Sequence, residues 1–145
     1  MNMRAKTIPS VLIVLLLWGG AVSCQSKPEA SVEVTQSEGV VNVDVNVAAF
    51  AALIDTAETG LILDVRTDRE FAMGHIRGAA QIDFYRNDFR EELAKLDPNV
   101  PVYVYCRSGN RSGQAAKMMK SMGFKTVYNL EGGMGAWVRQ QPVEK

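Results

Sequence analysis

The stretch that decides the fold is PVYVY, Pro101 to Tyr105, followed at once by CRSGNRS, Cys106 to Ser112. The first five residues form a short apolar run rich in β-branched and aromatic side chains, which predicts a strand buried on both faces. A turn containing a glycine then leads into the helical pattern of residues 112–122. A residue at such a junction meets converging backbone N–H groups and the positive end of a helix dipole. Cys106 occupies that position.

This position predicts a reactive thiolate at Cys106. Helix-terminal N–H groups and nearby arginines favour S⁻ over SH and lower the pKa of a cysteine thiol below its free value of about 8.5. The plainer interpretation is a small buried hydrophobe, which is how most free cysteines behave. We favour the thiolate because two unpaired guanidinium groups near an apolar core are costly to desolvate unless the loop meets an anion. The predicted substrate-binding residues are Arg107, Ser108, Gly109, Asn110, Arg111 and Ser112.

Strand and helix patterns alternate along the rest of the chain. Strands are predicted at 41–45, 61–65, 81–83, 100–105 and 126–130. Helices are predicted at 47–54, 69–73, 88–96, 112–122 and 135–140. Such alternation implies a parallel sheet with helices on both faces. The predicted fold class is therefore α/β, a single domain with a central parallel five-stranded sheet.

The first strand differs from the others because three valines alternate with Asn42 and Asp44. That period predicts a strand with one buried face, and Asn46 is placed to cap the helix that follows. The strand predicted at 61–65 is instead apolar without alternation, as in the interior of a parallel sheet. We therefore expect the first strand to be the half-buried one.

In open parallel sheets, ligands bind beyond the carboxyl ends of the strands. Asp64, Cys106 and Glu131 each lie at such an end, so the sequence predicts a site at one rim of the sheet. Asp64, together with Arg66 and Glu70, is expected to support the cysteine loop by hydrogen bonds or ion pairs, rather than to act as an acid or a base. Arg111 is expected either to orient an anionic substrate or to brace the loop.

Three segments of the chain resemble the rhodanese-like sulfurtransferases. The active loop of that family reads Cys, four residues, Arg, then Ser or Thr, as residues 106–112 do. Residues 64–79, with DVR, EF and GHIRGA, look like the family's first signature, and residues 130–137, with LEGGM and a tryptophan, look like its closing one. They occur in the expected order over roughly residues 43–140. Cysteine-dependent phosphatases resemble the loop too, but they place five residues between cysteine and arginine, and the smaller ring here suits one sulfur atom better than a phosphate.

The resemblance implies a thiosulfate sulfurtransferase of the rhodanese type. The Cys106 thiolate would take the outer sulfur of a donor such as thiosulfate, hold it as a persulfide, and pass it to a thiol or cyanide. Two alternatives stay open: a persulfide carrier or binding module for a partner protein, and a cysteine-dependent phosphatase or arsenate reductase. His75 is expected to be structural, since a thiolate stabilised by a helix needs no base, and Trp137 is expected to anchor the core. Phe84, Tyr85 and Tyr105 fit either the edge of the site or the core.

The first residues predict export. Arg4 and Lys6 precede the apolar run 11–18, and small residues lead to Cys24, as in a signal peptide. The arrangement resembles a bacterial lipoprotein, with a signal peptide over 1–23 and an acylated Cys24 as the mature N-terminus. Ordinary cleavage near Cys24, or a transmembrane anchor, is the alternative. We expect a cell-envelope lipoprotein facing the periplasm, in the outer membrane if the host is Gram-negative.

We expect the remaining chain to divide into a flexible tether over 25–42 and a domain over 43–141 that resembles the rhodanese-like family. Without the first 23 residues the chain has 122, enough for one domain, with 14 basic and 16 acidic side chains. This balance argues against nucleic acid as a partner. With two cysteines and one histidine, the sequence predicts no metal site and no cofactor. The expected partners are a small sulfur-containing anion, a thiol or cyanide acceptor, and a membrane through the lipid anchor, and we expect a monomer.

Overall fold

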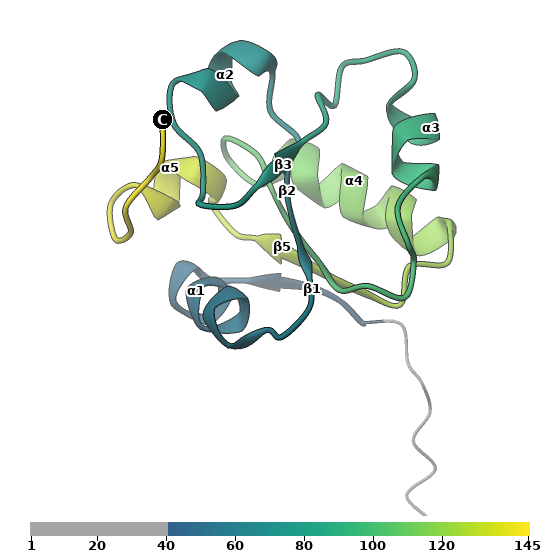
Figure 1. The fold of residues 1–145 in the computed structure, drawn as a ribbon, viewed down its shortest axis with the longest axis horizontal. Coiled ribbons are helices and arrows are strands. Elements are labelled where there is room, and N and C mark those ends of the chain that lie inside the picture. The colour runs from purple at the N-terminus through teal and green to yellow at the C-terminus, as the bar shows by residue number, and fades with distance from the viewer. Residues whose placement is uncertain (1–40) are drawn as a thin grey trace, which may run out of the picture. The chain divides into compact units, whose positions relative to one another are not determined.

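The alternating sequence patterns form strands and helices in strict alternation (Figure 1). The computed structural model describes residues 41–145, so the predicted signal peptide, Cys24 and most of the tether lie outside the described residues. The strands are β1 (Val41–Val45), β2 (Leu61–Asp64), β3 (Ala80–Gln81), β4 (Val102–Tyr105) and β5 (Thr126–Leu130). The helices are α1 (Val47–Thr56), α2 (Asp68–Ala72), α3 (Phe89–Ala94), α4 (Asn110–Ser121) and α5 (Gly133–Trp137). Asn46 caps α1 as predicted, because its side chain accepts a hydrogen bond from Ala49 N.

The strands form one sheet in the order β1-β5-β4-β2-β3, and every pair is parallel. β4 lies in the centre, and all four of its residues are buried, as its apolar run predicted. Because all strands point the same way, the ends of β2, β4 and β5 meet at one rim. The predicted α/β class with a parallel five-stranded sheet is confirmed.

Helices cover both faces of the sheet, as predicted. On one face α3 and α4 pack against the sheet through Leu93, Met119 and their neighbours. On the other face α1 and α5 do so through Phe50, Trp137 and their neighbours. Figure 1 shows α1 and α5 to the left of the sheet and α3 and α4 to the right. Trp137 is buried in the second cluster, so its predicted role as a core anchor is confirmed.

Several element bounds differ from the sequence prediction by a few residues, and so does the burial of the first strand. α4 begins at Asn110, two residues early, because Gly109 has a φ of +95° and turns the chain straight into the helix. α5 likewise begins two residues before the predicted start. In β1 the valine side is poorly covered, with Val43 46% exposed, since an edge strand has one neighbour. Asn42 instead donates to Ala116 O on α4.

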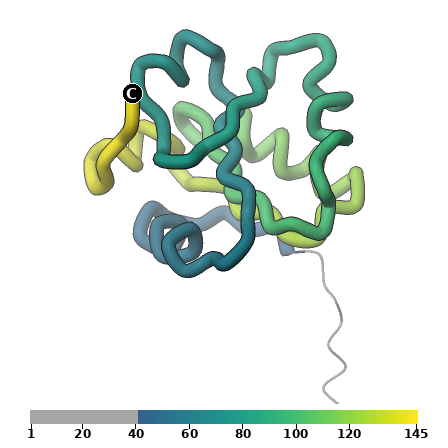
Figure 2. The backbone as a smooth tube through the Cα atoms, viewed as in Figure 1, coloured from purple at the N-terminus to yellow at the C-terminus, as the bar shows by residue number. Residues whose placement is uncertain are grey.

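The C-terminal segment returns to the chain that follows α2 (Figure 2). His75 and Glu144 pair through their backbones, and Trp137 Nε1 donates to Pro142 O at 2.9 Å. The His75 ring stacks on Phe71 with centroids 4.0 Å apart, which is a packing role. Within residues 41–145, no helix has both the length and the apolar character needed to cross a bilayer.

Candidate active site

The cysteine loop carries the chain from the buried end of β4 into α4. Cys106 follows Tyr105 directly, and its sulfur accepts hydrogen bonds from Gly109 N at 3.2 Å and from Ser112 Oγ at 3.4 Å. Ser112 lies in the first turn of α4, so the helix itself supplies a donor. Cys106 and Ser112 are both 0% exposed. The sulfur is therefore shielded from solvent in this conformation.

Two opposing effects set the pKa of the Cys106 thiol. Burial raises the pKa, because a thiolate loses its hydration. Hydrogen bonds from the Ser112 hydroxyl and from the backbone N–H groups of Ser112, Ser108 and Gly109 lower it, and together they outweigh burial. The thiol therefore ionises more readily than an ordinary cysteine, as the loop sequence predicted.

Arg111 leaves the loop and binds α2. Its Nη1 and Nη2 donate to the two carboxylate oxygens of Glu70 at 2.9 and 2.8 Å. These hydrogen bonds from Arg111 hold the pKa of Glu70 at about 2 despite its partial burial. Glu70 also forms the capping box of α2 with Thr67. Of the two expected roles for Arg111, bracing the loop is the one its contacts match.

A second ion pair lies at the end of the neighbouring strand β2. Arg66 Nη2 donates to Asp64 Oδ2 at 2.6 Å and to Gly74 O at 2.7 Å, and both side chains are buried. Asp64 also accepts from Arg66 N, so the pair fixes the backbone where β2 ends. Tyr105 belongs to this core, because it is fully buried and its hydroxyl oxygen accepts from Ile76 N.

The loop after β5 packs against the backbone of the cysteine loop. Met134 N donates to Cys106 O at 2.8 Å, and Gly135 N donates to Arg107 O at 3.0 Å. A Cβ on Gly133 would overlap Cys106 O and lie 2.8 Å from Arg107 C, so only glycine fits there. The sequence placed Gly133 in a family signature without a role, and only this close approach supplies one.

The other loop residues lie on the surface on different sides of the sulfur. Arg107 is exposed beside a hollow of about 350 Å³, which Met73, Met134 and Val138 also line. Asn110 accepts from Gln114 Nε2 and lines a groove between α4 and the strands β1 and β5. Of the loop residues, Gly109 and Ser112 donate to the sulfur, the backbone N–H of Ser108 also acts on it, and the Asn110 side chain binds Gln114 instead.

The aromatic side chains near the loop divide between surface and core. Tyr85 is 67% exposed, and Arg111 Cζ lies 5.4 Å from the centre of its ring. Phe84 packs against the core on the α3 side. Tyr85 thus borders the site through Arg111, a contact that sequence spacing alone did not reveal. Among residues 41–145, no three His, Cys, Asp or Glu side chains gather closely enough to hold a metal ion.

Comparison with known proteins places this geometry in context. The profile of the rhodanese-like domain matches residues 46–140. The thiosulfate sulfurtransferase GlpE of Pseudomonas entomophila is 33% identical over 64% of this chain and 84% of its own. The putative sulfur carrier protein YrkF of Bacillus subtilis is 36% identical over 65% of this chain, which spans only 50% of YrkF. A rhodanese-like domain protein from Staphylococcus aureus superposes with a TM-score of 0.60, at 28% identity, over 70% of this chain and 95% of that one.

Proposed function

This chain belongs to the rhodanese-like domain family, and from its loop geometry we propose that it is a sulfurtransferase that works through a Cys106 persulfide. The donor we propose is thiosulfate or a similar sulfane-sulfur anion, and the acceptor is a thiol or cyanide. The relative named thiosulfate sulfurtransferase supports this choice. The observation that carries the proposal is the convergence of Gly109 N and Ser112 Oγ on one buried sulfur.

The reaction divides into two displacements. The Cys106 thiolate attacks the outer sulfur of thiosulfate, a new S–S bond forms, and the old S–S bond breaks as sulfite leaves with the electron pair. The acceptor, as cyanide or a thiolate, then attacks the outer sulfur and releases the Cys106 thiolate. No outside oxidant or reductant is needed, because the transferred sulfur carries the oxidation state with it.

The loop residues support both displacements. Donors that stabilise the thiolate also stabilise the charge on a persulfide, since an added sulfur occupies the same ring of N–H groups. The Arg107 side chain is exposed and forms no hydrogen bond or ion pair with residues 41–145, so it is free to attract the anionic donor. Arg111 is bound to Glu70 and braces the loop at the start of α4.

The test is a donor and acceptor screen on the full-length protein, with sulfite release as the readout. Thiosulfate with cyanide should give turnover, and Cys106→Ser should abolish it, because a serine hydroxyl stays protonated at neutral pH. Thermal unfolding of the variant checks that it folds. Substantial turnover by the serine variant, or faster hydrolysis of an aryl phosphate than sulfur transfer, would refute the assignment.

A persulfide carrier is the second candidate. Two observations favour it: Cys106 has no exposed surface, and one relative is named a putative sulfur carrier. A carrier should keep its sulfur against small thiols and lose it to a protein partner. Mass spectrometry of the loaded protein, with and without a small thiol, separates the two functions, since rapid discharge to any small thiol is the behaviour of the broad enzyme.

We also propose that the protein is monomeric and acts at the cell envelope, anchored by a lipid on Cys24. Two sequence features support the lipid anchor: residues 1–23 resemble a signal peptide, and small residues precede Cys24. Metabolic labelling with a radioactive fatty acid should mark the wild type and not Cys24→Ala. Equal labelling of both chains would contradict the anchor, and gel filtration tests the monomer.

A further inference from the structure

Exposed apolar side chains gather beside the cysteine loop. Among residues 41–145, five large apolar side chains are exposed: Tyr85, Met73, Val138, Val43 and Val143, at 67, 63, 54, 46 and 38%. Single exposed apolar residues are ordinary on a protein surface, whereas a group of them marks an interaction site. The three most exposed border the cysteine loop. Val43, by contrast, lies on β1, which β5 separates from β4.

Two of these side chains, Met73 and Val138, line the hollow beside Arg107. Its lining also includes Gly135, which has no side chain to fill the space, and Met134, which is buried in the core. The volume of about 350 Å³ lies within the range of binding pockets, and a mainly apolar lining is typical of them. The hollow therefore offers apolar surface to a ligand directly beside the cysteine loop.

The charges in the hollow are unevenly paired. Arg66 is paired with Asp64, and Glu70 is paired with Arg111. Of the charged residues that line the hollow, only Arg107 forms no ion pair with residues 41–145. An apolar surface with one free cation is complementary to an apolar partner that carries an acidic residue. Methionine, tyrosine and arginine are also the residue types enriched where proteins bind each other.

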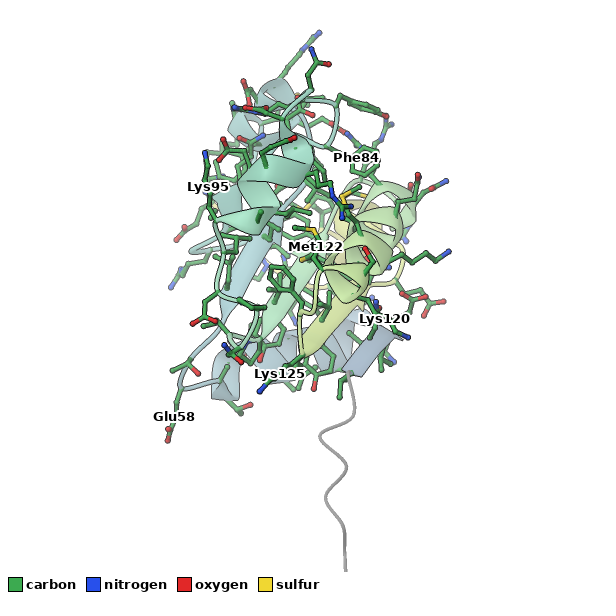
Figure 3. The ribbon with its side chains drawn as sticks, turned by 90° about the vertical axis from the view of Figure 1, so that its right-hand side faces the viewer. Glu58, Phe84, Lys95, Lys120, Met122 and Lys125 are labelled. Atoms are coloured by element: carbon green, nitrogen blue, oxygen red, sulfur yellow. The ribbon has the colours of Figure 1, made fainter. Side chains whose placement is uncertain are left out.

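Tyr85 extends this surface beyond the ion pair of Glu70. Its ring lies 5.4 Å from Arg111 Cζ, and Arg111 binds Glu70, which lines the hollow. Figure 3 shows Phe84, the neighbour of Tyr85 in the chain, at the opposite end of the domain from Glu58. Glu58 precedes β2, so Tyr85 lies towards the rim where the strands end.

The backbone fixes these side chains in place although little of the protein covers them. Met73 ends α2 and precedes Gly74, whose carbonyl a buried arginine binds at 2.7 Å. The N–H of Val138 closes the last turn of α5, and that of Tyr85 donates to Asp83 Oδ1 at 2.9 Å. A surface that is already fixed loses less conformational entropy when a partner binds.

We propose that Tyr85, Met73, Val138 and Arg107 form a docking surface for a partner protein that presents an acceptor cysteine flanked by apolar and acidic residues. This inference rests on the proposed sulfurtransferase function and names the class of its acceptor. The partner's thiolate attacks the outer sulfur of the Cys106 persulfide, a new S–S bond forms on the partner, and Cys106 leaves as a thiolate with the electron pair. Cyanide has no group to place on these side chains, whereas the residues next to a protein cysteine do.

The test compares three synthetic peptides as acceptors for the persulfide-loaded full-length protein: acetyl-LLCEL-amide, acetyl-GGCGG-amide and acetyl-LLCKL-amide. The rate of sulfur transfer to each peptide is divided by its rate with dipyridyl disulfide, which removes differences in thiol pKa. The LLCEL peptide should exceed GGCGG about tenfold, because its leucines bury apolar surface, and LLCKL about threefold, because its glutamate faces a cation. Equal corrected rates for LLCEL and either other peptide would overturn the proposal.

Matched variants of the protein test whether this surface causes the preference. Val138→Ser and Val43→Ser each remove one exposed valine, and only Val138 lines the hollow. Val138→Ser should lower the ratio of the LLCEL rate to the cyanide rate about threefold, and Met73→Ser with Val138→Ser about tenfold. Val43→Ser should leave that ratio unchanged. The same ratio in Val138→Ser and Val43→Ser would refute the docking surface.

Sulfite release during loading is measured before any acceptor is added, so it tests the proposed function separately. Absence of sulfite release would refute sulfur transfer and the docking surface together, whereas normal release with equal peptide rates refutes the surface alone. Two other occupants would also refute it. One is a second copy of this chain, if gel filtration shows a dimer that Met73→Ser with Val138→Ser dissociates. The other is a lipid surface, if that double variant loses binding to phosphatidylglycerol vesicles.

Discussion

β2 and β4 are neighbouring strands that end at the same rim of the sheet. The polar groups in the two loops that follow them bind different partners. After β2, the charges of Asp64 and Arg66 satisfy each other and the nearby backbone. After β4, Gly109 N and Ser112 Oγ converge on the sulfur of Cys106. Mutual pairing fixes a backbone, whereas donors gathered on one atom stabilise an anion there. Burial alone therefore does not separate the supporting loop from the reactive one, but the direction of the hydrogen bonds does.

Arg111 and Glu70 join the two loops. Glu70 lies in α2, after β2, and Arg111 lies in α4, after β4. The reactive loop thus takes its brace from the supporting one. The four predictions below test this division, starting with the largest effect.

Asp64→Asn should damage the supporting loop most. The substitution keeps the shape of the side chain but leaves the buried Arg66 guanidinium without a counter-charge. We expect the free energy of unfolding to fall by about 3 to 5 kcal/mol in urea denaturation. The control is Asp88→Asn, which breaks the exposed pair with Arg86 and should change little. Similar losses in the two variants would show that the buried pair has no special part in stability.

Glu70→Gln tests the brace through pH. The folded pKa of Glu70 is about 2, below its ordinary 4.5, so its contribution is present above about pH 4.5 and is lost as the pH falls towards 2. Between about pH 4.5 and pH 2, the free energy of unfolding of the wild type should fall by about 1 to 2 kcal/mol more than that of the variant. This figure allows for the partial exposure of Glu70. Unfolding curves at several pH values measure the difference. Parallel pH profiles would mean that the ion pair with Arg111 contributes nothing to stability.

Ser112→Ala tests the reactive loop. Loss of the hydroxyl that donates to the Cys106 sulfur should raise the pKa of the thiol. Alkylation by iodoacetamide at neutral pH should slow about tenfold, as expected for the loss of one charge-assisted hydrogen bond. Ser108→Ala is the matched control, because the Ser108 side chain is exposed and only its backbone N–H acts on the sulfur. If both variants keep the wild-type pH profile, the Ser112 hydroxyl does not set the reactivity.

Arg107→Ala should have the smallest effect. An exposed cation that attracts the donor should mainly affect binding, so KM for thiosulfate should rise about fivefold while kcat changes little. Arg107→Lys should recover part of the loss. Added salt should reduce the difference between the wild type and Arg107→Ala, because it screens an exposed charge. A fall in kcat at constant KM would place Arg107 in the chemical step instead.

Local features of the fold were predictable from the sequence. The buried strand before Cys106, the cap at Asn46 and the alternation of strands with helices depend on residues close together in the chain. The same holds for the cysteine at a helix start, because the N–H groups that reach it come from the next six residues. Segments 64–79 and 130–137 were identified by resemblance; support of the cysteine loop was expected from Asp64, Arg66 and Glu70, but their individual partners were not.

Contacts between distant segments were not predictable. Arg111 and Glu70 are 41 residues apart in the chain. The sequence left two roles open for Arg111, and only its contact with Glu70 in the structure distinguishes them. Alternation in β1 predicted one buried face, but its place at the edge leaves Val43 exposed and its polar side chains line the groove beside α4.

The sequence by itself determined where a thiolate can form, because that depends on a strand, a turn and a helix that are consecutive. Only the tertiary structure decided which charges support that thiolate and which remain free for ligands. Which charged side chains pair depends on the order of the strands in the sheet. That order is set by the packing of helices on both faces of the sheet rather than by any local sequence pattern.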